Sequence, residues 1–415
     1  MNLFSSPVRP EDVFTPRSPE VNSNMYISRP ALEAAISAAL RRNLHMLIHG
    51  ESGTGKSWLY KSSLIRLGVP YLVANLANAS RLGSIAAELQ NLIDREQNAS
   101  KVSYEEEKTA ELSTLIAKGA LSHTGQYEIG KKEPFEACLD FLNKKYGGKQ
   151  TVLVFDNLEA AFTEPLLKEL ADLIILCDDE RYSSYKVKIL IVGVPSGVKE
   201  YYYRTPNHMT VANRLTELPE VARLEKVECD ALVERGFVEK LSYQIDDLTT
   251  LKAHISWVSD RVPQIIHDYC LELSLLCESD KHVTQSKIDE ANAIWLSGSM
   301  QYAYAAIESH MNERETKAAR RNQVLYALSL CDGEQFKYTE IEVIVREQFP
   351  QSTNQTNLNI SAVLSQLSKG DKPLIKRSPK GDAFTFVDPR YRIVLRAVLI
   401  KNAQEKVEKR SITKG

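Results

Sequence analysis

The sequence predicts an α/β protein, with a parallel sheet and helices between its strands, followed by a helical region and a small α+β module. Over about the first 225 residues, short apolar runs alternate with helix-length amphipathic stretches, which is the pattern of a parallel sheet with crossover helices. Beyond that point the strand-like runs stop and helical periodicity takes over. Near the C-terminus, three helical stretches precede two short apolar segments that flank a turn.

The composition is that of an ordinary globular protein. At 415 residues the chain is too long for one core, and two or three domains are expected. Its 43% hydrophobic and 26% charged residues are typical of globular domains. We expect no transmembrane helix, because no apolar run approaches 18 residues, and no signal peptide. The six cysteines are scattered, which favours a reducing, cytoplasmic location without a disulfide framework or a zinc site.

The elements of the sheet region follow in chain order. An extended arm rich in Pro, Ser and Asn is expected over residues 1–24. Helices are expected over 31–41, 58–65, 82–95, 134–145 and 166–178. Strands are expected over 44–49, 69–76, 151–156 and 187–194. The polar stretch 99–132 has weak periodicity, and we interpret it as an irregular insert.

A complete phosphate-binding loop stands between the first strand and the next helix. Its eight residues are Gly50, Glu51, Ser52, Gly53, Thr54, Gly55, Lys56 and Ser57. The glycines let the backbone curl until its N–H groups face phosphate oxygens, and the helix N-terminus, with Trp58 in its first turn, favours an anion. In such a loop Lys56 reaches the β- and γ-phosphates and the Ser57 hydroxyl binds Mg²⁺. The sequence therefore predicts a site for a nucleoside triphosphate, which we take to be ATP.

Asp156 is the second element of this site. It ends an apolar strand, so it lies at the carboxyl edge of the sheet, where open α/β sheets bind ligands. Beside a phosphate loop its carboxylate would hold Mg²⁺ together with Ser57. The alternative is that Asp156 caps the helix that follows.

Asn157 and Glu159, which follow Asp156 in the sequence, bear on catalysis. Asn157 follows it directly, and Glu159 stands three positions after it. Glu159 would orient the attacking water if the chain turns helical at once. It would equally serve as a capping-box carboxylate that faces its own backbone. The sequence does not decide between these two roles.

The remainder of the chain reads as a helical bundle and a winged helix-turn-helix. Bundle helices are expected over 231–239, 248–258, 262–276 and 284–296. Three more helices, over 321–328, 339–349 and 357–369, precede the short segments 374–375 and 384–386. Three helices followed by a β-hairpin is the order of a winged helix.

The C-terminal end has the features of a nucleic-acid surface. Residues 371–415 contain 12 Lys/Arg against 5 Asp/Glu, whereas the chain as a whole has a formal charge of −2. The helix 357–369 would present polar side chains to DNA: Asn357, Asn359, Ser361, Ser365, Gln366 and Lys369. Lys376, Arg377 and Lys380 would lie on the wing, against backbone phosphates. A solvated charged tail, or a winged helix that docks protein, would explain the same residues.

These features together resemble a known family. The order of phosphate loop, Asp-x-x-Glu strand end, third strand, helical region and winged helix resembles the initiator-type AAA+ ATPases, of the origin-recognition and related clades. It is also similar to STAND and to transposition or defence ATPases. The resemblance covers roughly residues 15–400, and only the phosphate loop is highly specific. It implies an ATPase core over 25–225, a lid over 226–305, a winged helix over 306–400 and a basic tail over 401–415.

The resemblance gives further positions a role. Ile27 and Arg29 lie in a segment similar to the family's adenine-packing box, although the same residues also suit a chain that enters a helix at Pro30. Ser196 is nearest to the family's sensor 1 position. Arg214 matches its arginine finger, which acts in a neighbouring subunit, and a surface salt bridge is the alternative. Arg261 is near its sensor 2 position, but the register departs from the family pattern.

Two functions remain open from the sequence. The first is an ATP- and Mg²⁺-dependent ATPase that engages duplex DNA through its winged helix, as a homo-oligomer or in a protein complex, away from membranes. The second is a STAND-like nucleotide switch with slow or no hydrolysis that acts through a protein partner, for example in phage defence. A nucleotide kinase is disfavoured, because no arginine-rich substrate lid follows residue 225.

Overall fold

The computed structural model describes residues 8–105, 133–194, 201, 204–205, 208–311, 319–331, 333, 335–378 and 381–410. Contacts divide the chain into two compact units. We call residues 19–21 and 28–222 the sheet unit, and the described residues of 8–18, 22–27 and 223–410 the helical unit. The expected division into arm, core, lid, winged helix and tail is finer than these two units and stays a prediction.

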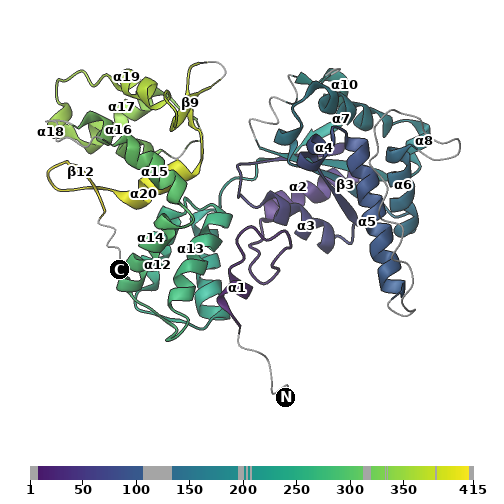
Figure 1. Cartoon of the computed structure of the whole chain (residues 1–415), viewed down its shortest axis with the longest axis horizontal. Helices are drawn as coiled ribbons and strands as arrows, with labels where there is room; N and C mark the ends of the chain where they lie inside the picture. The colour runs from purple at the N-terminus through teal and green to yellow at the C-terminus, as the bar shows by residue number, and fades with distance from the viewer. Residues whose placement is uncertain are drawn as a thin grey trace, which may run out of the picture. The chain divides into compact units, whose positions relative to one another are not determined.

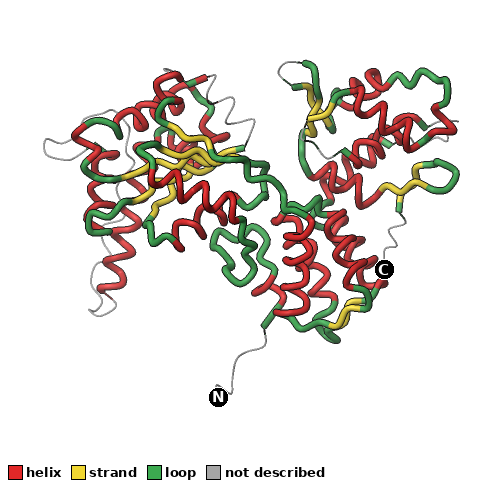
Figure 2. The backbone as a smooth tube through the Cα atoms, turned by 180° about the vertical axis from the view of Figure 1, so that it is seen from behind, coloured by secondary structure: helices red, strands yellow, loops and turns green. Residues whose placement is uncertain are grey.

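The sheet unit is built on one parallel five-stranded sheet with the order β2-β3-β4-β1-β5, as predicted for its class (Figure 2). Its strands are β1 (His45–His49), β2 (Tyr71–Asn75), β3 (Thr151–Asp156), β4 (Val187–Gly193) and β5 (Leu215–Glu217). Since all five run the same way, the loops after their carboxyl ends meet at one edge. The sequence analysis missed β5, because a strand of three residues with one buried side chain is too short to show an alternating hydrophobic pattern.

Strand residues alternate between the two faces of the sheet. Val152 and Val154 of β3 pack on the side of α2 and α3, whereas Leu153 and Phe155 pack against α4 to α7. The helices of this unit are α2 (Pro30–Arg41), α3 (Lys56–Arg66), α4 (Leu76–Leu82), α5 (Ile85–Glu105), α6 (Pro134–Lys145), α7 (Glu164–Leu176), α8 (Glu180–Ser183) and α10 (His208–Ala212), with the 3₁₀ helix η1 (Leu158–Ala161).

The five helices predicted for this unit correspond to α2, α3, α5, α6 and α7, whereas α8 and α10 were not predicted, and two further corrections apply. The prediction of an irregular insert over 99–132 is wrong at the start of that range, because α5 continues to Glu105. Its remainder, 106–132, lies outside the described residues. The sequence also missed α4, which starts directly after β2 and is capped by the Asn75 side chain, an acceptor for the Ala77 N–H at 2.9 Å.

The helical unit includes residues 8–18 of the expected N-terminal arm, which are not extended throughout. They include a turn of helix, and the Phe14 side chain is fully buried against Gly236 and Phe237. A Cβ at Gly236 would lie 2.3 Å from the Phe14 ring, so this position has room only for glycine. The helices here are α1 (Pro10–Val13), α11 (Lys226–Glu234), the π-helix η2 (Arg235–Lys240), α12 (Leu248–Val258), α13 (Pro263–Leu276), α14 (Gln285–Ser297) and α15 (Gln301–His310). The expectation that strands stop after 225 is wrong for the short pair β6 (Gln244–Ile245) and β7 (His282–Val283).

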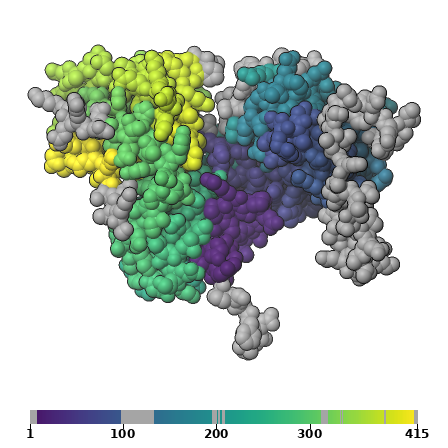
Figure 3. Space-filling view, in the orientation of Figure 1, coloured from purple at the N-terminus to yellow at the C-terminus, as the bar shows by residue number. Residues whose placement is uncertain are grey.

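The C-terminal part of this unit contains the expected helices and hairpin (Figure 1), and its residues form one packed body in the space-filling view (Figure 3). A three-stranded antiparallel sheet has the order β8-β10-β9. The elements are α16 (Arg320–Leu330), β8 (Gln335–Phe336), α17 (Tyr338–Gln348), α18 (Pro350–Thr353), α19 (Ile360–Leu367), β9 (Ile375–Arg377), β10 (Phe384–Phe386), α20 (Arg390–Val398), β11 (Leu399–Lys401) and β12 (Val407–Lys409). The sequence missed β8, α20 and the β11–β12 hairpin, which includes part of the stretch expected to be a tail. No helix among the described residues is long and apolar enough to cross a membrane.

Candidate nucleotide-binding site

The phosphate loop has the backbone that its glycines predict. Gly53 and Gly55 have φ values of 82° and 91°, a region that glycine adopts without strain. A Cβ at Gly50 would lie 2.3 Å from the Val221 carbonyl oxygen, so any side chain there would displace backbone. Gly55 is the N-cap of α3, whose first N–H groups have no partner within the helix. The loop thus has the cradle that a phosphate group requires.

Lys56 lies inside this cradle. Its Nζ donates to the carbonyl oxygens of Gly50 at 2.8 Å and Glu51 at 2.9 Å. Burial lowers the pKa of Lys56, and the negative charges of Glu159, Asp156 and Glu51 oppose that shift. Phosphate oxygens make stronger, charge-assisted bonds to an ammonium group than neutral carbonyls do. The Lys56 ammonium is therefore held where phosphate oxygens can replace its carbonyl partners.

Asp156 and Ser57 come together at the carboxyl edge of the sheet. The Ser57 hydroxyl donates to Asp156 Oδ2 at 3.3 Å, and the Tyr60 hydroxyl lies 3.5 Å from the same oxygen. Burial raises the pKa of Tyr60. The N-cap of η1 is Asn157 and not Asp156, so the capping alternative for Asp156 has no support in the structure. A hydroxyl and a carboxylate side by side are oxygen ligands suited to Mg²⁺.

Asn157 extends this arrangement toward β2. It has a φ of 64°, which Asn tolerates better than most residues, and its N–H donates to Asp156 Oδ1 at 2.9 Å. Its side-chain amide donates to Asn75 Oδ1 at 3.1 Å. Asn75 ends β2 opposite Asp156, and its N–H is held by Glu88 at 3.2 Å. Sequence reasoning missed Asn75 and Tyr60, although Asn75 stands at a strand end where polar residues deserve scrutiny.

Glu159 is exposed in η1, close to Lys56. Among the charges near the Lys56 ammonium, the Glu159 carboxylate acts most strongly to raise the pKa of Lys56, and it makes no hydrogen bond to a residue that the structure describes. Because Asn157 is the N-cap of η1, the capping-box position is Ala160 and not Glu159. The geometry therefore favours the water-orienting role of Glu159 over the capping role.

Arg29 contacts the backbone of the phosphate loop and of residue 222. The side chain is buried, and its guanidinium donates to the Ala222 carbonyl at 2.7 Å and points at the Thr54 carbonyl 3.5 Å away. Ile27 belongs to the helical unit, where it packs against the hydrophobic core. The predicted adenine-packing segment is thus divided between the two units, and the contacts of Arg29 are those of a residue that fixes loop shape.

Arg214 precedes β5 at the amino end of the sheet, where Leu215 pairs with His45. The phosphate loop follows the opposite end of β1, so Arg214 lies a strand length from its own chain's loop. Its Nε is 2.6 Å from Asp178 Oδ2, and its guanidinium also donates to the Thr210 carbonyl at 2.9 Å. This position suits either an intramolecular ion pair or a finger that acts on another copy.

The other predicted contacts are less informative. Trp58 is half-buried in the first turn of α3. Arg261 belongs to the helical unit, with a φ of 57° and its N–H bonded to Ser259 Oγ at 3.1 Å. Ser196 lies outside the described residues, as does Lys380 of the expected wing.

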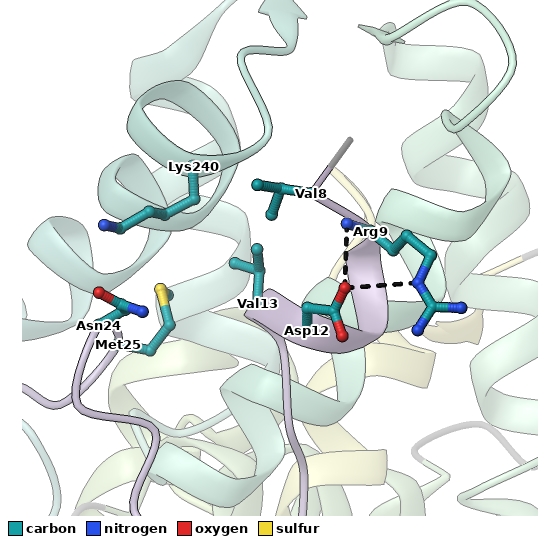
Figure 4. Close-up of a pocket in the computed structure, with 7 residues that line it drawn as sticks. All are labelled: Val8, Arg9, Asp12, Val13, Asn24, Met25 and Lys240. Atoms are coloured by element: carbon teal, nitrogen blue, oxygen red, sulfur yellow. Dashed lines mark hydrogen bonds and ion pairs between the residues drawn. The ribbon is translucent and has the colours of Figure 1, made fainter. Parts of the chain in front are cut away.

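A cavity of about 680 Å³ in the helical unit is a separate feature (Figure 4). The N-terminal segment and the end of η2 line it, and Arg9 is bonded to Asp12 at its rim. The lining residues are Val8, Arg9, Asp12, Val13, Asn24, Met25 and Lys240. None of the predicted site residues lines this cavity, so we do not assign it to the nucleotide.

Comparisons with known proteins agree with the geometry. Residues 40–201 match the family model described as an AAA domain. A Walker-type ATPase of Pyrococcus abyssi is similar in structure, with a TM-score of 0.50 at 17% identity, over 95% of this chain and 99% of the other. Cdc6p of Pyrobaculum aerophilum aligns with a TM-score of 0.46 at 12% identity, over 94% and 98% of the two chains. The ADP form of the ORC2 protein of Aeropyrum pernix aligns with a TM-score of 0.47 at 14% identity, over 94% of this chain and 97% of the other. No curated protein matched the sequence.

The phosphate loop and the family match agree on the class of the sheet unit. It has the fold of a P-loop ATPase, and residues 40–201 within it match an AAA domain.

Proposed function

We propose that the protein is an ATP-binding AAA+ ATPase whose nucleotide state controls how a C-terminal winged helix engages duplex DNA. The observation that carries the proposal is the gathering of Lys56, Ser57, Asp156 and Glu159 at one edge of the sheet. A phosphate cradle, a pair of oxygen ligands for a metal and a free carboxylate are the parts that phosphoryl transfer to water needs.

Each residue has a distinct task in this proposal. The loop 50–57 holds the phosphates of ATP, and Lys56 neutralises charge on the β- and γ-phosphates. Ser57 and Asp156 hold Mg²⁺, which supplies positive charge beside the phosphates. Glu159 orients the attacking water. Arg214, at the far end of the sheet, acts in the site of another copy, so hydrolysis depends on assembly.

The DNA-binding part of the proposal rests on α19 and β9. The order α16, β8, α17, α18, α19, β9 and β10 supports this part, because a winged helix would have three main helices before its hairpin and α19 as its recognition helix. Ser361, Gln366 and Lys369 are exposed on or just after α19, and the Arg321 guanidinium is bonded to Gln366 at 2.9 Å. Lys376 and Arg377 of β9 are exposed cations.

The count of Lys and Arg over residues 371–415 overstated the number of exposed cations on this surface. Two of the 12 cations beyond residue 370, Arg392 and Arg396, are only 2% and 5% exposed and belong to the core. Four exposed cations, Lys369, Lys372, Lys376 and Arg377, lie on or near α19 and β9. Neutralising four phosphates predicts that the logarithm of the DNA affinity falls with the logarithm of salt with a slope of about −3.6.

One observation favours the second function, a nucleotide switch with slow turnover. Asn157 directly follows Asp156, and it is held in place by the hydrogen bonds that its backbone N–H donates to Asp156 and its side-chain amide donates to Asn75. An amide does not accept a proton from water as a carboxylate does. In that case ATP stays bound, and the C-terminal module acts on a protein partner.

The test of nucleotide binding is the affinity of the purified chain for ATP in the presence of Mg²⁺, measured by calorimetry. Lys56→Ala removes the ammonium from the cradle, so we expect at least about a hundredfold loss of affinity with the fold retained. Lys61→Ala is the matched control, because Lys61 lies on the same helix and donates to the Pro19 carbonyl at 2.7 Å instead. Equal affinity of a folded Lys56→Ala variant and the wild type would refute the proposal.

The test of DNA engagement is the affinity for a labelled duplex, titrated from low to moderate salt with ATPγS or with ADP. We expect two different affinities and the salt slope given above. The double variant K376Q/R377Q should reduce the slope by about two units, whereas K406Q, an exposed lysine in the β11–β12 turn, should leave it unchanged. The same affinity with both nucleotides would leave the switch-and-partner function as the better account.

A further inference from the structure

A buried carboxylate in the helical unit is surrounded by three arginines. Asp260 is 1% exposed, and its oxygens lie 2.8 Å from Arg223 Nη1, 2.8 Å from Arg392 Nε and 2.5 Å from Arg396 Nη1. We call these four residues the Asp260 cluster. Arg223 is the first residue of the 223–410 part of the helical unit, and Arg392 and Arg396 lie on α20.

The backbone at this position is strained. Asp260 and Arg261 have φ values of 51° and 57°, the left-handed region that non-glycine residues avoid. Side-chain bonds hold the turn in this shape: Ser259 Oγ donates to the Ile255 carbonyl at 2.6 Å and accepts from the Arg261 N–H at 3.1 Å. A strained turn persists only where its surroundings determine it, so the cluster fixes the position of this turn.

The cluster makes contacts with α20, with the end of α16 and with Gly333. The Arg396 guanidinium stacks on the Trp257 ring at 4.6 Å, and the Trp257 indole N–H donates to the Arg396 carbonyl at 3.1 Å. The Arg396 Nε–H also donates to the Ser329 carbonyl at 2.7 Å, and Arg392 donates to the Gly333 carbonyl at 2.9 Å. A movement of the 259–261 turn would therefore displace α20 and the end of α16, to which these bonds connect it.

The cluster is also joined by chain continuity to the phosphate loop. The Val221 N–H donates to the His49 carbonyl at 2.8 Å, next to Gly50, and the Ala222 carbonyl accepts from Arg29 at 2.7 Å. The next two residues belong to the helical unit: Arg223 pairs with Asp260, and the Leu224 N–H donates to the Arg261 carbonyl at 3.0 Å. Of the four consecutive residues 221–224, the first two thus make contacts within the sheet unit and the last two within the helical unit.

We infer that the Asp260 cluster couples the phosphate loop to the C-terminal module. A change at the loop when nucleotide binds passes through residues 221–224 to the 259–261 turn and from there to α20. This regulation rests on the proposed function in that ATP is the ligand at the loop. Asp260 touches no substrate in this account and acts by positioning.

The test is hydrogen exchange of the backbone amides of α20, in the full chain, with and without saturating ATPγS and Mg²⁺. In the wild type we expect nucleotide to change these exchange rates by about fivefold or more, the usual lower range for coupled sites. Arg223→Gln breaks the bond between the 221–224 segment and Asp260 while two arginines still pair with the carboxylate. We expect it to lose the α20 response and to bind ATPγS within about twofold of the wild type.

Two further variants separate coupling from general damage. Asp260→Asn should also lose the response; if it fails to fold, Arg223→Gln alone decides. Asp268→Asn is the matched control, because Asp268 is a carboxylate of the same unit that bonds Trp295 at 2.9 Å and lies outside the cluster. It should keep the full response. A folded Arg223→Gln variant with an undiminished response, or a wild type that binds ATPγS without any change in α20, would overturn the inference.

The same samples keep this inference distinguishable from the proposed function. If α20 responds to nucleotide but the duplex affinity is the same with ATPγS and ADP, the coupling stands and the DNA part of the proposed function fails. If the duplex affinity depends on nucleotide in Arg223→Gln as strongly as in the wild type, the proposed function stands and the coupling route is wrong.

Discussion

The two units each contain a cluster of opposite charges, and the two clusters are built for different purposes. At the nucleotide site one ammonium faces three carboxylates, Lys56 donates to two loop carbonyls, and Glu159 is exposed. In the Asp260 cluster one buried carboxylate faces three guanidinium groups, each with protein partners.

The difference shows what burial does to a charge. A charged group that is partly open to water can exchange its partners for a ligand, which is what a binding site requires. A fully buried pair is strongly destabilising to break, because the remaining charge has no water to solvate it. The nucleotide site is therefore expected to tolerate substitution in the folded state, and the Asp260 cluster is not.

The largest expected effect contrasts the two carboxylates directly. Asp260→Ala leaves three buried guanidinium groups without their counter-charge and should lower the free energy of unfolding of the helical unit by about 3–5 kcal/mol. Asp156→Ala, at the partly open site, should change the stability of the sheet unit by about 1 kcal/mol or less while it removes the proposed metal ligand. Denaturation of Asp260→Ala in a Trp58→Phe background follows Trp257 and Trp295, which both belong to the helical unit, and denaturation of Asp156→Ala in a Trp257→Phe/Trp295→Phe background follows Trp58 of the sheet unit. Similar losses for the two variants would contradict the contrast.

A smaller effect concerns a buried neutral histidine in each unit. Burial lowers the pKa of His267 and of His45 to about 4, from an ordinary value of 6.5. Between those values the unfolded chain binds the proton and the folded chain does not, so stability falls as the pH is lowered through this window. Each histidine should contribute a loss of about 2 kcal/mol between pH 7 and pH 5.

The variant His267→Gln separates the two contributions. His267 accepts the Thr15 N–H at Nδ1, a bond that the glutamine side-chain oxygen can also accept. The variant should flatten the pH dependence of the helical unit and leave that of the sheet unit unchanged. An unchanged pH slope in unfolding followed by Trp257 and Trp295 would argue against a neutral buried His267.

The smallest effect is expected at the ion pair of Arg214 and Asp178. Their side chains are 27% and 46% exposed, so water screens the pair, and Asp178→Asn should cost less than about 1 kcal/mol. If Arg214 is a finger, the same substitution leaves it free and should not reduce ATP hydrolysis, whereas Arg214→Ala should reduce it by about a thousandfold in the assembled protein. Equal turnover of Arg214→Ala and the wild type would leave only the ion-pair role.

The parts of the candidate nucleotide site could be predicted from the sequence, because they are local. Eight consecutive residues specify the loop, and Asp156 is recognisable as the end of an apolar strand. The sequence could not predict the Asp260 cluster, since Asp260 and Arg396 are 136 positions apart and neither belongs to a motif. Counting charges assigned Arg392 and Arg396 to a DNA surface, because a count cannot tell a buried guanidinium from an exposed one. Asn75 was missed for a related reason: its partner Asn157 lies on another strand end, 82 positions away.

The central claim is that nucleotide chemistry at the loop is linked to DNA at the C-terminal module. The most direct test is phosphate release from ATP by the purified protein, with and without duplex DNA, beside Lys56→Ala. The account predicts turnover that requires Lys56 and rises when duplex is added. ATP that stays bound and intact in both conditions would contradict it, and would identify the protein as a switch that acts through a protein partner.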